Sequence, residues 1–440
     1  MSVLIKILQL ILSLSILVVL HEMGHFVAAR IFKVRVEKFY LFFNPWFSLF
    51  KYKYKETEYG IGWLPLGGYV KISGMIDESM DKEQMKQPPQ PWEFRTKPAW
   101  QRLIIMLGGV TVNILLAMVI YIALLSVFGE KYLPTSELKY GVVVDSLGYE
   151  IGLRNGDKIY AIDGNPVEDF NHIPEAMILD EAKTIQVYRN EQPYEIQIPE
   201  GITAKLLKHK TPFISYRIPF VVGGFAEESP AKATGILEKD RIVGINEIPT
   251  PFFDQFKEAI ADYKGQEVTL KVLRERDTLT YPLTVTESGM IGVAPVNQTT
   301  YFFNLHQRSF SLLEAIPRGV AKTFQEISSY WKQLKLLVKP QTKAYESIGS
   351  FITIGSIFPS TWNWEVFWRL TAFLSVMLAI LNVLPIPALD GGHVLFLLVE
   401  MITGRKPGER FLEIAQMIGM ILLLGLFLLA TGNDIIKLFN

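Results

Sequence analysis

The chain has 440 residues, of which 49% are hydrophobic, and its 44 Lys and Arg residues balance its 44 Asp and Glu residues. The zero net charge argues against a nucleic-acid partner, and the mean hydropathy of +0.23 is high for a soluble protein. The sequence contains no cysteine, which excludes disulfides, thiolate metal sites and cysteine nucleophiles. Any bound metal must therefore use His, Asp or Glu.

The first predicted element is a membrane-spanning helix over residues 3–31. Its start resembles a signal peptide, but no small-residue cleavage site follows and the apolar run continues, so we expect the helix to be retained. His21-Glu22-Met23-Gly24-His25 within it follows the H-E-x-x-H pattern. Residues four apart share a helix face, so His21 and His25 could bind one zinc ion. Glu22 lies about 100° around the helix, where it could take a proton from the attacking water.

The membrane setting favours a functional role for these residues over a chance match. A charged side chain at the middle of a membrane helix costs roughly 2.5–3.5 kcal/mol on insertion scales. At 1.5 Å per residue, His21 lies about 27 Å along the helix from residue 3. This depth places the motif near the cytoplasmic edge of the membrane core.

The loop over residues 32–102 is expected to form strands near the membrane surface. Residues 34–72 are rich in aromatic and β-branched side chains, with turn signals at Asn44-Pro45 and Gly67-Gly68. The sequence "QPPQPW" (87–92) favours an extended connector. A second membrane span is predicted over residues 103–127.

Lysine and arginine near the predicted spans indicate the orientation of the chain. They gather on one side, at Arg30, Lys33, Arg35, Lys38, Arg95, Lys97, Arg102, Arg405, Lys406 and Arg410. The other side has only Lys6, Lys131 and Lys437 close to the spans. We therefore expect loops 32–102 and 389–410 to face the cytoplasm, and both termini and residues 128–366 to face outward.

The middle of the chain contains an internal repeat. "GLRNGDKIYAIDGNP" (152–166) matches "GILEKDRIVGINEIP" (235–249) at a constant offset of 83 residues. Each copy continues into an alternating pattern typical of strands, which predicts two small β-rich domains in tandem, 128–218 and 219–305. Residues 306–350 are amphipathic and helical in pattern, within a segment over 306–365. That helix could lie at the outer membrane surface or pack on the two β-rich domains.

The last region, 366–440, is expected to contain two further spans, 367–388 and 411–431, with a short helix over 393–404 between them. Pro385 and Pro387 break the third span, and broken backbone at membrane depth is tolerated where it lines a cavity. A catalytic zinc needs a third protein ligand and an open position, and Asp390 in this break is the expected ligand. His393 is its competitor, and Glu400 and Glu413 are weaker candidates.

These motifs together resemble the site-2 protease family of intramembrane metalloproteases. The resemblance rests on H-E-x-x-H in the first span and N-x-x-P-x-P-x-L-D-G in a later one, with "PLGGYVKI" and "GGVTVN" between them. The repeated G-x-x-x-x-D-x-I-x-x-I pattern resembles PDZ domains, with carboxylate loops expected at 140–144 and 220–225. One departure is that the second span lacks the proline of the family's frequent G-P-x-x-N motif. The resemblance covers essentially the whole chain.

The resemblance implies a polytopic α-helical membrane protein with four transmembrane helices. A membrane-associated β-rich loop would lie on the cytoplasmic side, and two tandem PDZ domains on the outer, periplasmic side of a bacterial inner membrane. Zinc would be bound by His21, His25 and Asp390, with Glu22 as the general base. The implied substrate is a single-span membrane protein, typically an anti-sigma factor trimmed by another protease, in a stress response that uses regulated intramembrane proteolysis. The implied substrate-binding residues are Gly67, Gly68, Tyr69, Asn382 and Pro385.

Other interpretations assign the same residues differently. The chain could be an outward-facing PDZ scaffold or sensor whose zinc site is structural, which a closed four-ligand site would support. A zinc transporter is less compatible, because polar candidate ligands occur in only two spans and no transport repeat is visible. Asn113 and Asn382 could serve as hydrogen-bonding residues between helices, an alternative that for Asn113 has the same weight as substrate contact.

Overall fold

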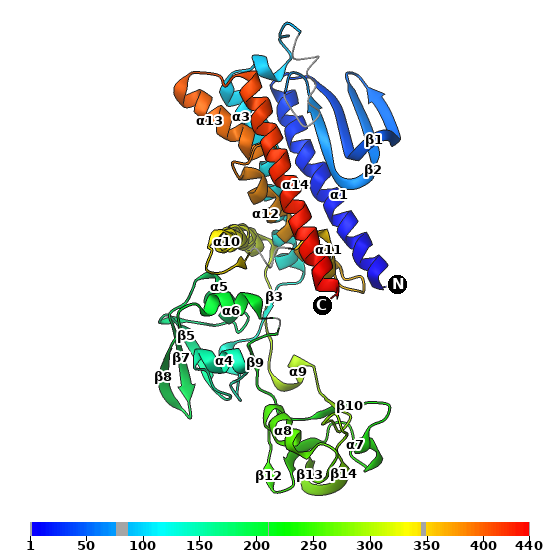
Figure 1. Ribbon diagram of the computed structural model, residues 1–440, viewed down its shortest axis with the longest axis vertical. Helices are drawn as coiled ribbons and strands as arrows, with labels where there is room; N and C mark the ends of the chain where they lie inside the picture. The colour runs from blue at the N-terminus through cyan, green and yellow to red at the C-terminus, as the bar shows by residue number, and fades with distance from the viewer. Residues whose placement is uncertain (1, 76–86, 210, 345–348, 440) are drawn as a thin grey trace. The chain divides into compact units, whose positions relative to one another are not determined.

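The computed structural model describes residues 2–75, 87–209, 211–344 and 349–439. The chain divides into two compact units, which we call the membrane unit and the repeat unit (Figure 1). The membrane unit comprises Met1–Gly129, Ser309–Val338 and Tyr345–Asn440, and the repeat unit comprises Glu130–Arg308 and Lys339–Ala344. The helices of the membrane unit are α1 (Ser2–Ile31), η1 (Phe94–Thr96), α3 (Ala99–Val127), α10 (Leu312–Val338), α11 (Phe351–Ile357), α12 (Trp364–Val383), α13 (Asp390–Thr403) and α14 (Glu409–Phe439).

Four helices of the described chain, α1, α3, α12 and α14, are long and apolar enough to cross a membrane. The prediction of four spans is thus confirmed in length and composition. The third span was predicted too far, since α12 ends at Val383 and not at residue 388. The reason is local, because Leu384 precedes Pro385 and the residue before a proline disfavours the helical conformation. The short helix also begins earlier than predicted, so Asp390 is the first residue of α13.

The H-E-x-x-H turn of α1 crosses α3 at very close range. A Cβ atom added to Gly24 would lie 2.3 Å from the carbonyl oxygen of Gly108, so only glycine permits this approach. Helix α3 continues without interruption through the stretch where the family's proline is missing. The two glycines therefore fix the motif against a regular helix.

Helix α10 packs on the membrane helices. Gly319 lies against Ile122 of α3, and the rings of Tyr330 and Phe373 of α12 are 6.2 Å apart between centroids. Figure 1 shows α10 end-on while α14 runs along its length, so α10 crosses the direction of the spans. Helix α10 is thus part of the membrane unit.

The loop after α1 forms one antiparallel hairpin of two long strands, β1 (Val36–Tyr54) and β2 (Thr57–Ile72). Both strands fold back on themselves, since Tyr40 pairs with Gly60 and also with Tyr69. Residues 38–41 therefore lie between two parts of β2, residues 58–61 and residues 68–71. Among the described residues, segment 68–72 pairs with a strand on one side only. We use the term free edge of β2 for its other side, which has no strand partner there.

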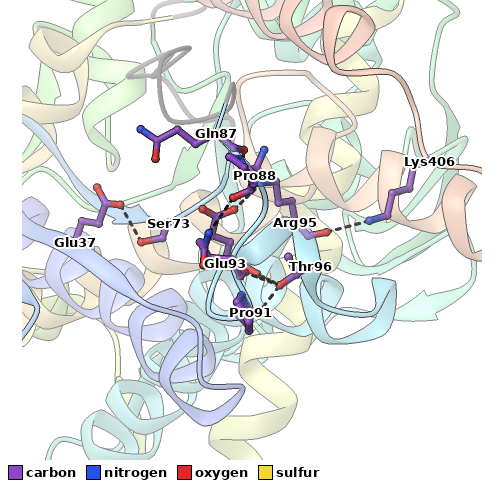
Figure 2. Close-up of polar contacts among 10 residues, drawn as sticks. Glu37, Ser73, Gln87, Pro88, Pro91, Glu93, Arg95, Thr96 and Lys406 are labelled. Carbon is purple, nitrogen blue, oxygen red and sulfur yellow. Dashed lines mark hydrogen bonds and ion pairs between the residues drawn. The ribbon is translucent and has the colours of Figure 1, made fainter.

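A connector after the hairpin, residues 87–97, ties the hairpin base to the loop between α13 and α14 (Figure 2). Arg95 donates to the Glu93 carboxylate at 2.6 Å and to the Gln87 carbonyl at 2.8 Å. The carbonyl of Arg95 accepts a hydrogen bond of 3.0 Å from Lys406 Nζ. On the other side, the Phe94 amide donates to the Ser73 carbonyl at 2.8 Å, next to the end of β2.

The repeat unit contains two four-stranded sheets with the same topology. Their strand orders are β6-β5-β7-β8 and β12-β11-β13-β14, and β5, β6 and β7 begin 83 residues before β11, β12 and β13. The repeat seen in the sequence is thus a repeat of structure, and each sheet covers its own apolar core. The first sheet consists of β5 (Lys158–Ile162), β6 (Asn165–Pro166), β7 (Thr184–Arg189) and β8 (Gln192–Gln197), and the second of β11 (Arg241–Ile245), β12 (Ile248–Pro249), β13 (Glu267–Arg274) and β14 (Asp277–Thr284).

The remaining elements of this unit are short and flank the two sheets. The helices are η2 (Thr135–Glu137), α4 (Ser146–Ile151), α5 (His172–Leu179), α6 (Ile202–Lys208), α7 (Pro230–Ala233), α8 (Phe253–Ile260), η3 (Ala261–Tyr263) and α9 (Thr299–Phe302). The strands pair as β3 (Glu130–Tyr132) with β16 (His306–Arg308), β4 (Val142–Val144) with β9 (Ile214–Tyr216), and β10 (Val222–Phe225) with β15 (Val293–Pro295). The expected carboxylate loops, 140–144 and 220–225, therefore contain β4 and β10.

Candidate metal centre

Three side chains from two distant parts of the chain meet inside the membrane unit. The Nε2 atoms of His21 and His25 each lie 3.2 Å from Oδ2 of Asp390, and 3.3 Å from one another. Both imidazoles are buried, with 6% and 4% of their residue surface exposed. Among the described residues, these three form the only cluster of His and carboxylate side chains whose ligand atoms converge closely enough for one metal ion.

The other nitrogen of each imidazole is held by α3. His25 Nδ1 lies 2.8 Å from the carbonyl oxygen of Ile105, which can only accept, so Nδ1 carries the proton and Nε2 presents its lone pair to the cluster. His21 Nδ1 lies 3.1 Å from the side-chain amide of Asn113. Second partners of this kind orient metal-binding histidines and fix their tautomer.

The polar atoms of the cluster fit a bound cation. Asp390 Oδ2 is buried without a hydrogen-bond partner in the described chain, although it is the atom nearest both Nε2 atoms. Oδ1 of Asn113 is likewise buried and unpaired. Turning the Asn113 amide over would let Oδ1 accept from His21 Nδ1–H, which leaves Nε2 of His21 as a metal ligand. Two imidazoles and one carboxylate with an open position are a donor set typical of catalytic zinc.

A glycine of α3 leaves the space in which the two rings sit. A Cβ atom added to Gly109 would lie 2.5 Å from His21 Cε1 and 2.5 Å from His25 Nε2. Any side chain at this position would displace at least one imidazole. The "GGV" of the second span is therefore required by the cluster as well as by the helix crossing.

The cluster opens into a cavity of about 350 Å³. Its walls come from α1, the hairpin, α3, the 388–393 segment and α14, and the lining residues are His21, Glu22, His25, Phe43, Gly68, Tyr69, Val70, Ile72, Met75, Met106, Ala388, Leu389, Asp390, His393 and Gln416. Glu22 faces this space beside the three candidate ligands, as the helical spacing predicts. A carboxylate, a metal-binding cluster and room for a peptide thus lie together.

The free edge of β2 forms part of the cavity wall. Gly68, Tyr69 and Val70 line the cavity, and the backbone of Val70 is near enough to interact with the Glu22 carboxylate. Gly68 packs against α1, where an added Cβ would lie 2.7 Å from Val18. Gly67 has a φ of +146° and sits just outside the lining, so its glycine is needed for the backbone turn.

The other predicted residues lie at varied distances from the centre. Asn382 Nδ2 is 3.4 Å from His21 Nε2, whereas Pro385 is exposed in the break after α12 and does not line the cavity. His393 lines the cavity but is not a member of the cluster. Glu400 is buried in an ion pair with Arg102, and Glu413 also lies outside the cluster.

Two residues near the metal centre were not assigned to it from the sequence. For Asn113 two roles were left open, and Gln416 had no role. Asn113 was expected to contact either another helix or substrate, and its contact with His21 of α1 is of the first kind and also supports a candidate ligand. Gln416 of α14 lines the cavity and was not considered. A side-chain amide within an apolar span was the available signal for Gln416, as it was for Asn113.

Comparison with known proteins matches the whole chain to one group. The family described as "Peptidase family M50" matches residues 9–426. The "Regulator of sigma E protease" of Haemophilus influenzae is 26% identical, covering 97% of this chain and 98% of its own length. A "Putative zinc metalloprotease" of Xylella fastidiosa is 30% identical, covering 97% and 98%, and one of Clostridium perfringens is 28% identical, covering 97% of both chains.

Proposed function

Because the chain belongs to Peptidase family M50, the site-2 protease family, and is a zinc-dependent metalloprotease of that family, we propose that it hydrolyses a peptide bond within or near the transmembrane segment of a single-span protein. The observation that carries this proposal is the position of the candidate metal centre. The H-E-x-x-H turn belongs to an apolar helix long enough to cross a membrane, and it opens to a free strand edge. A protease with this arrangement can act on a membrane-embedded peptide.

We assign the zinc ligands as His21, His25 and Asp390, and the general base as Glu22. Bound zinc supplies a Lewis acid that acidifies water and polarises a carbonyl group. Glu22 accepts the proton of the attacking water and can then pass it to the leaving amine. Asn113 and the Ile105 carbonyl hold the two imidazoles in place. The open side of the cluster faces the cavity, which argues for catalysis over a closed structural site.

The substrate is proposed to bind as an added strand along residues 68–72. A transmembrane helix shields its peptide bonds with its own hydrogen bonds, so the scissile region must unwind before hydrolysis. Strand addition would give the unwound backbone new partners, which is essential where water is scarce. Gly68 and Tyr69 belong to this edge and Gly67 directly precedes it. We propose that Gly67 sets the course of the edge, and that Asn382 at the end of α12 and Pro385 in the break after it help hold the substrate.

The sidedness of the chain is proposed from the distribution of its basic residues. The metal centre lies toward the cytoplasmic side of a bacterial inner membrane, and the two repeats, with boundaries near 128–218 and 219–305, are PDZ domains in the periplasm. The other proposed regions of the chain are the first two spans with the cytoplasmic loop (1–127), the amphipathic helical segment (306–365) and the last two spans (366–440). The name of the Haemophilus influenzae relative refers to sigma E, which supports an anti-sigma factor as the substrate type and regulated intramembrane proteolysis in a stress response.

Glu22→Gln tests the assignment of roles. The variant should keep its zinc, because Glu22 is not a proposed ligand, and should lose detectable cleavage of a model single-span substrate, because the base is gone. Zinc content and cleavage should be measured on the same purified sample in detergent. Met23→Leu, on the exposed side of the same turn, is the matched control and should keep both.

Two results would contradict the assignment. Clear turnover by Glu22→Gln would remove its role as base, and loss of zinc along with activity would make it a ligand. Wild-type protein that binds zinc but cleaves no membrane-spanning substrate would instead favour a scaffold with a structural zinc site.

A further inference from the structure

Gln416 of α14 lines the catalytic cavity. Only 6% of its residue surface is exposed. Gly419, one turn further on, presses α14 against the break that precedes Asp390, because a Cβ there would lie 1.7 Å from the Pro387 carbonyl oxygen. Residues three apart share a helix face, so this contact also turns Gln416 toward the cavity.

Gln416 is a polar lining side chain, and no contact with the described chain explains its polarity. His21, His25 and Asp390 form the metal cluster, Glu22 is the proposed base, and the Tyr69 hydroxyl donates to Asn44 at 3.0 Å. Within the described chain, no hydrogen bond is formed by the Gln416 carboxamide. Its neighbours Met417, Ile418 and Met420 are exposed apolar residues.

Burying an amide without a hydrogen-bond partner costs free energy, about 1–3 kcal/mol in protein mutational data, whereas an amide beside a cavity can find its partner there. Packing explains such a residue when it bonds to another segment of the fold, as Gln9 does to the carbonyl of Pro359, between α11 and α12, at 2.8 Å. Gln416 has no bond of this kind, so its missing partner has to come from whatever fills the cavity.

We propose that Gln416 is a substrate-positioning residue whose carboxamide pairs with the backbone of the unwound substrate segment. This inference rests on the proposed function. A substrate strand added to β2 satisfies its backbone groups on one edge only, and its other edge needs donors and acceptors. A carboxamide offers both an N–H donor and a C=O acceptor, as a peptide group does. Gln416 would therefore recognise extended backbone, not particular side chains.

Crosslinking can test this placement directly, because the chain contains no cysteine. Gln416→Cys introduced into the Glu22→Gln variant would be the only thiol of the protease. A single cysteine is then moved through the transmembrane segment of a model substrate, and disulfides are formed with diamide. We expect crosslinks at a narrow set of positions around the scissile bond. Met417→Cys, on the exposed side of α14, should give no such discrete set.

Tyr69→Cys in the same background separates this inference from the proposed function. Crosslinks from Cys at 69 but none from Cys at 416 would overturn the role of Gln416 and leave strand addition intact. Crosslinks from neither position would overturn both.

Kinetics give an independent readout. Gln416→Leu should lower kcat/KM for the same substrate about tenfold, the loss expected for about one net hydrogen bond, mainly through a higher KM and with zinc unchanged. Gln416→Asn should recover part of the loss, because the amide is retained. Gln9→Leu makes the same change at a buried glutamine outside the cavity and should leave KM unchanged. A wild-type KM in Gln416→Leu would overturn the proposal.

Discussion

Aspartates in the two units of this protein have opposite kinds of partner. In the repeat unit, Asp157 receives two hydrogen bonds from Arg189 and one from the Arg154 amide. Asp240 receives the same set from Arg274 and the Leu237 amide. In the membrane unit, Asp390 faces two imidazoles and keeps an unpaired oxygen.

The contrast separates a structural carboxylate from a functional one. An aspartate with a guanidinium and a backbone amide has its charge balanced within the fold, and the second repeat reproduces this arrangement together with its strand order. A buried carboxylate without such partners is costly. A bound cation would explain why Asp390 stands beside two histidine nitrogens. The difference between Asp390 and the paired aspartates can be tested by making the same Asp→Asn substitution at both kinds of site.

Asp390→Asn should have the largest effect, and it should be confined to zinc and activity. The neutral amide is a poorer zinc ligand than a carboxylate. Loss of a group that only orients a ligand lowers metal affinity about 10–100-fold, so zinc affinity should fall further than this in Asp390→Asn, and cleavage should fall with it. Asp240→Asn should leave zinc and cleavage of the model substrate intact and instead destabilise the second repeat, by about 1–3 kcal/mol for a weakened buried hydrogen-bond set.

Zinc content measured by elemental analysis, together with hydrogen exchange of β11 and β13, distinguishes the two variants. His393→Ala is the control within the cavity and should keep most of its zinc. If His393→Ala loses zinc while Asp390→Asn keeps it, the third ligand has been assigned wrongly.

The parts of this picture that could be predicted are those set by local sequence. Hydropathy located α1, α3, α12 and α14, helical spacing placed His21, Glu22 and His25 together, and the repeated motif predicted two similar β-rich structures. Asp390 could be proposed because prolines and glycines mark a break in an apolar segment. The end of α12 is also determined by local sequence. It was predicted too late because the effect of Pro385 on the preceding residue was not taken into account.

The remaining features depend on contacts between distant segments. The support of His21 by Asn113 requires the close crossing of Gly24 and Gly108. The free edge at residues 68–72 arises because both hairpin strands fold back, which pairs residues 38–41 on both sides. The position of Gln416 depends on Gly419 contacting the break after α12. None of these contacts is encoded in periodicity or spacing.

The free edge gives the second prediction, with a smaller effect than loss of a ligand. Val70→Pro removes the backbone N–H of Val70, whose backbone lies near Glu22. If substrate pairs with this edge, cleavage of a single-span substrate should slow about tenfold, the value of roughly one net backbone hydrogen bond, while zinc stays bound. Val70→Ala keeps the N–H group and should cleave at close to the wild-type rate.

Substrate affinity measured in the Glu22→Gln background shows whether the slower cleavage of Val70→Pro comes from weaker substrate binding. Weaker binding by the Val70→Pro form supports strand addition. Full cleavage by Val70→Pro, or equal losses in the proline and alanine variants, would contradict it.

The smallest expected effect is a pH dependence of the stability of the second repeat, caused by the hydrogen-bonded carboxylate of Asp240. Burial alone would raise the pKa of Asp240, but the hydrogen bonds from Arg274 and the Leu237 amide outweigh it and lower this pKa below its usual value. A carboxyl group with a lowered folded pKa stabilises the fold above its unfolded pKa, which is about 3.9, and this stabilisation is lost as the pH falls through the folded pKa.

Protection of the β11 and β13 amides from hydrogen exchange, corrected for the intrinsic pH dependence of exchange, should therefore decline below about pH 4. Asp240→Asn should start with lower protection at neutral pH and show a flatter profile, because the titrating group is gone. Identical profiles for the two proteins would mean that the Asp240–Arg274 pair contributes no pH-dependent stability, and the contrast between paired and unpaired aspartates would then rest on zinc binding alone.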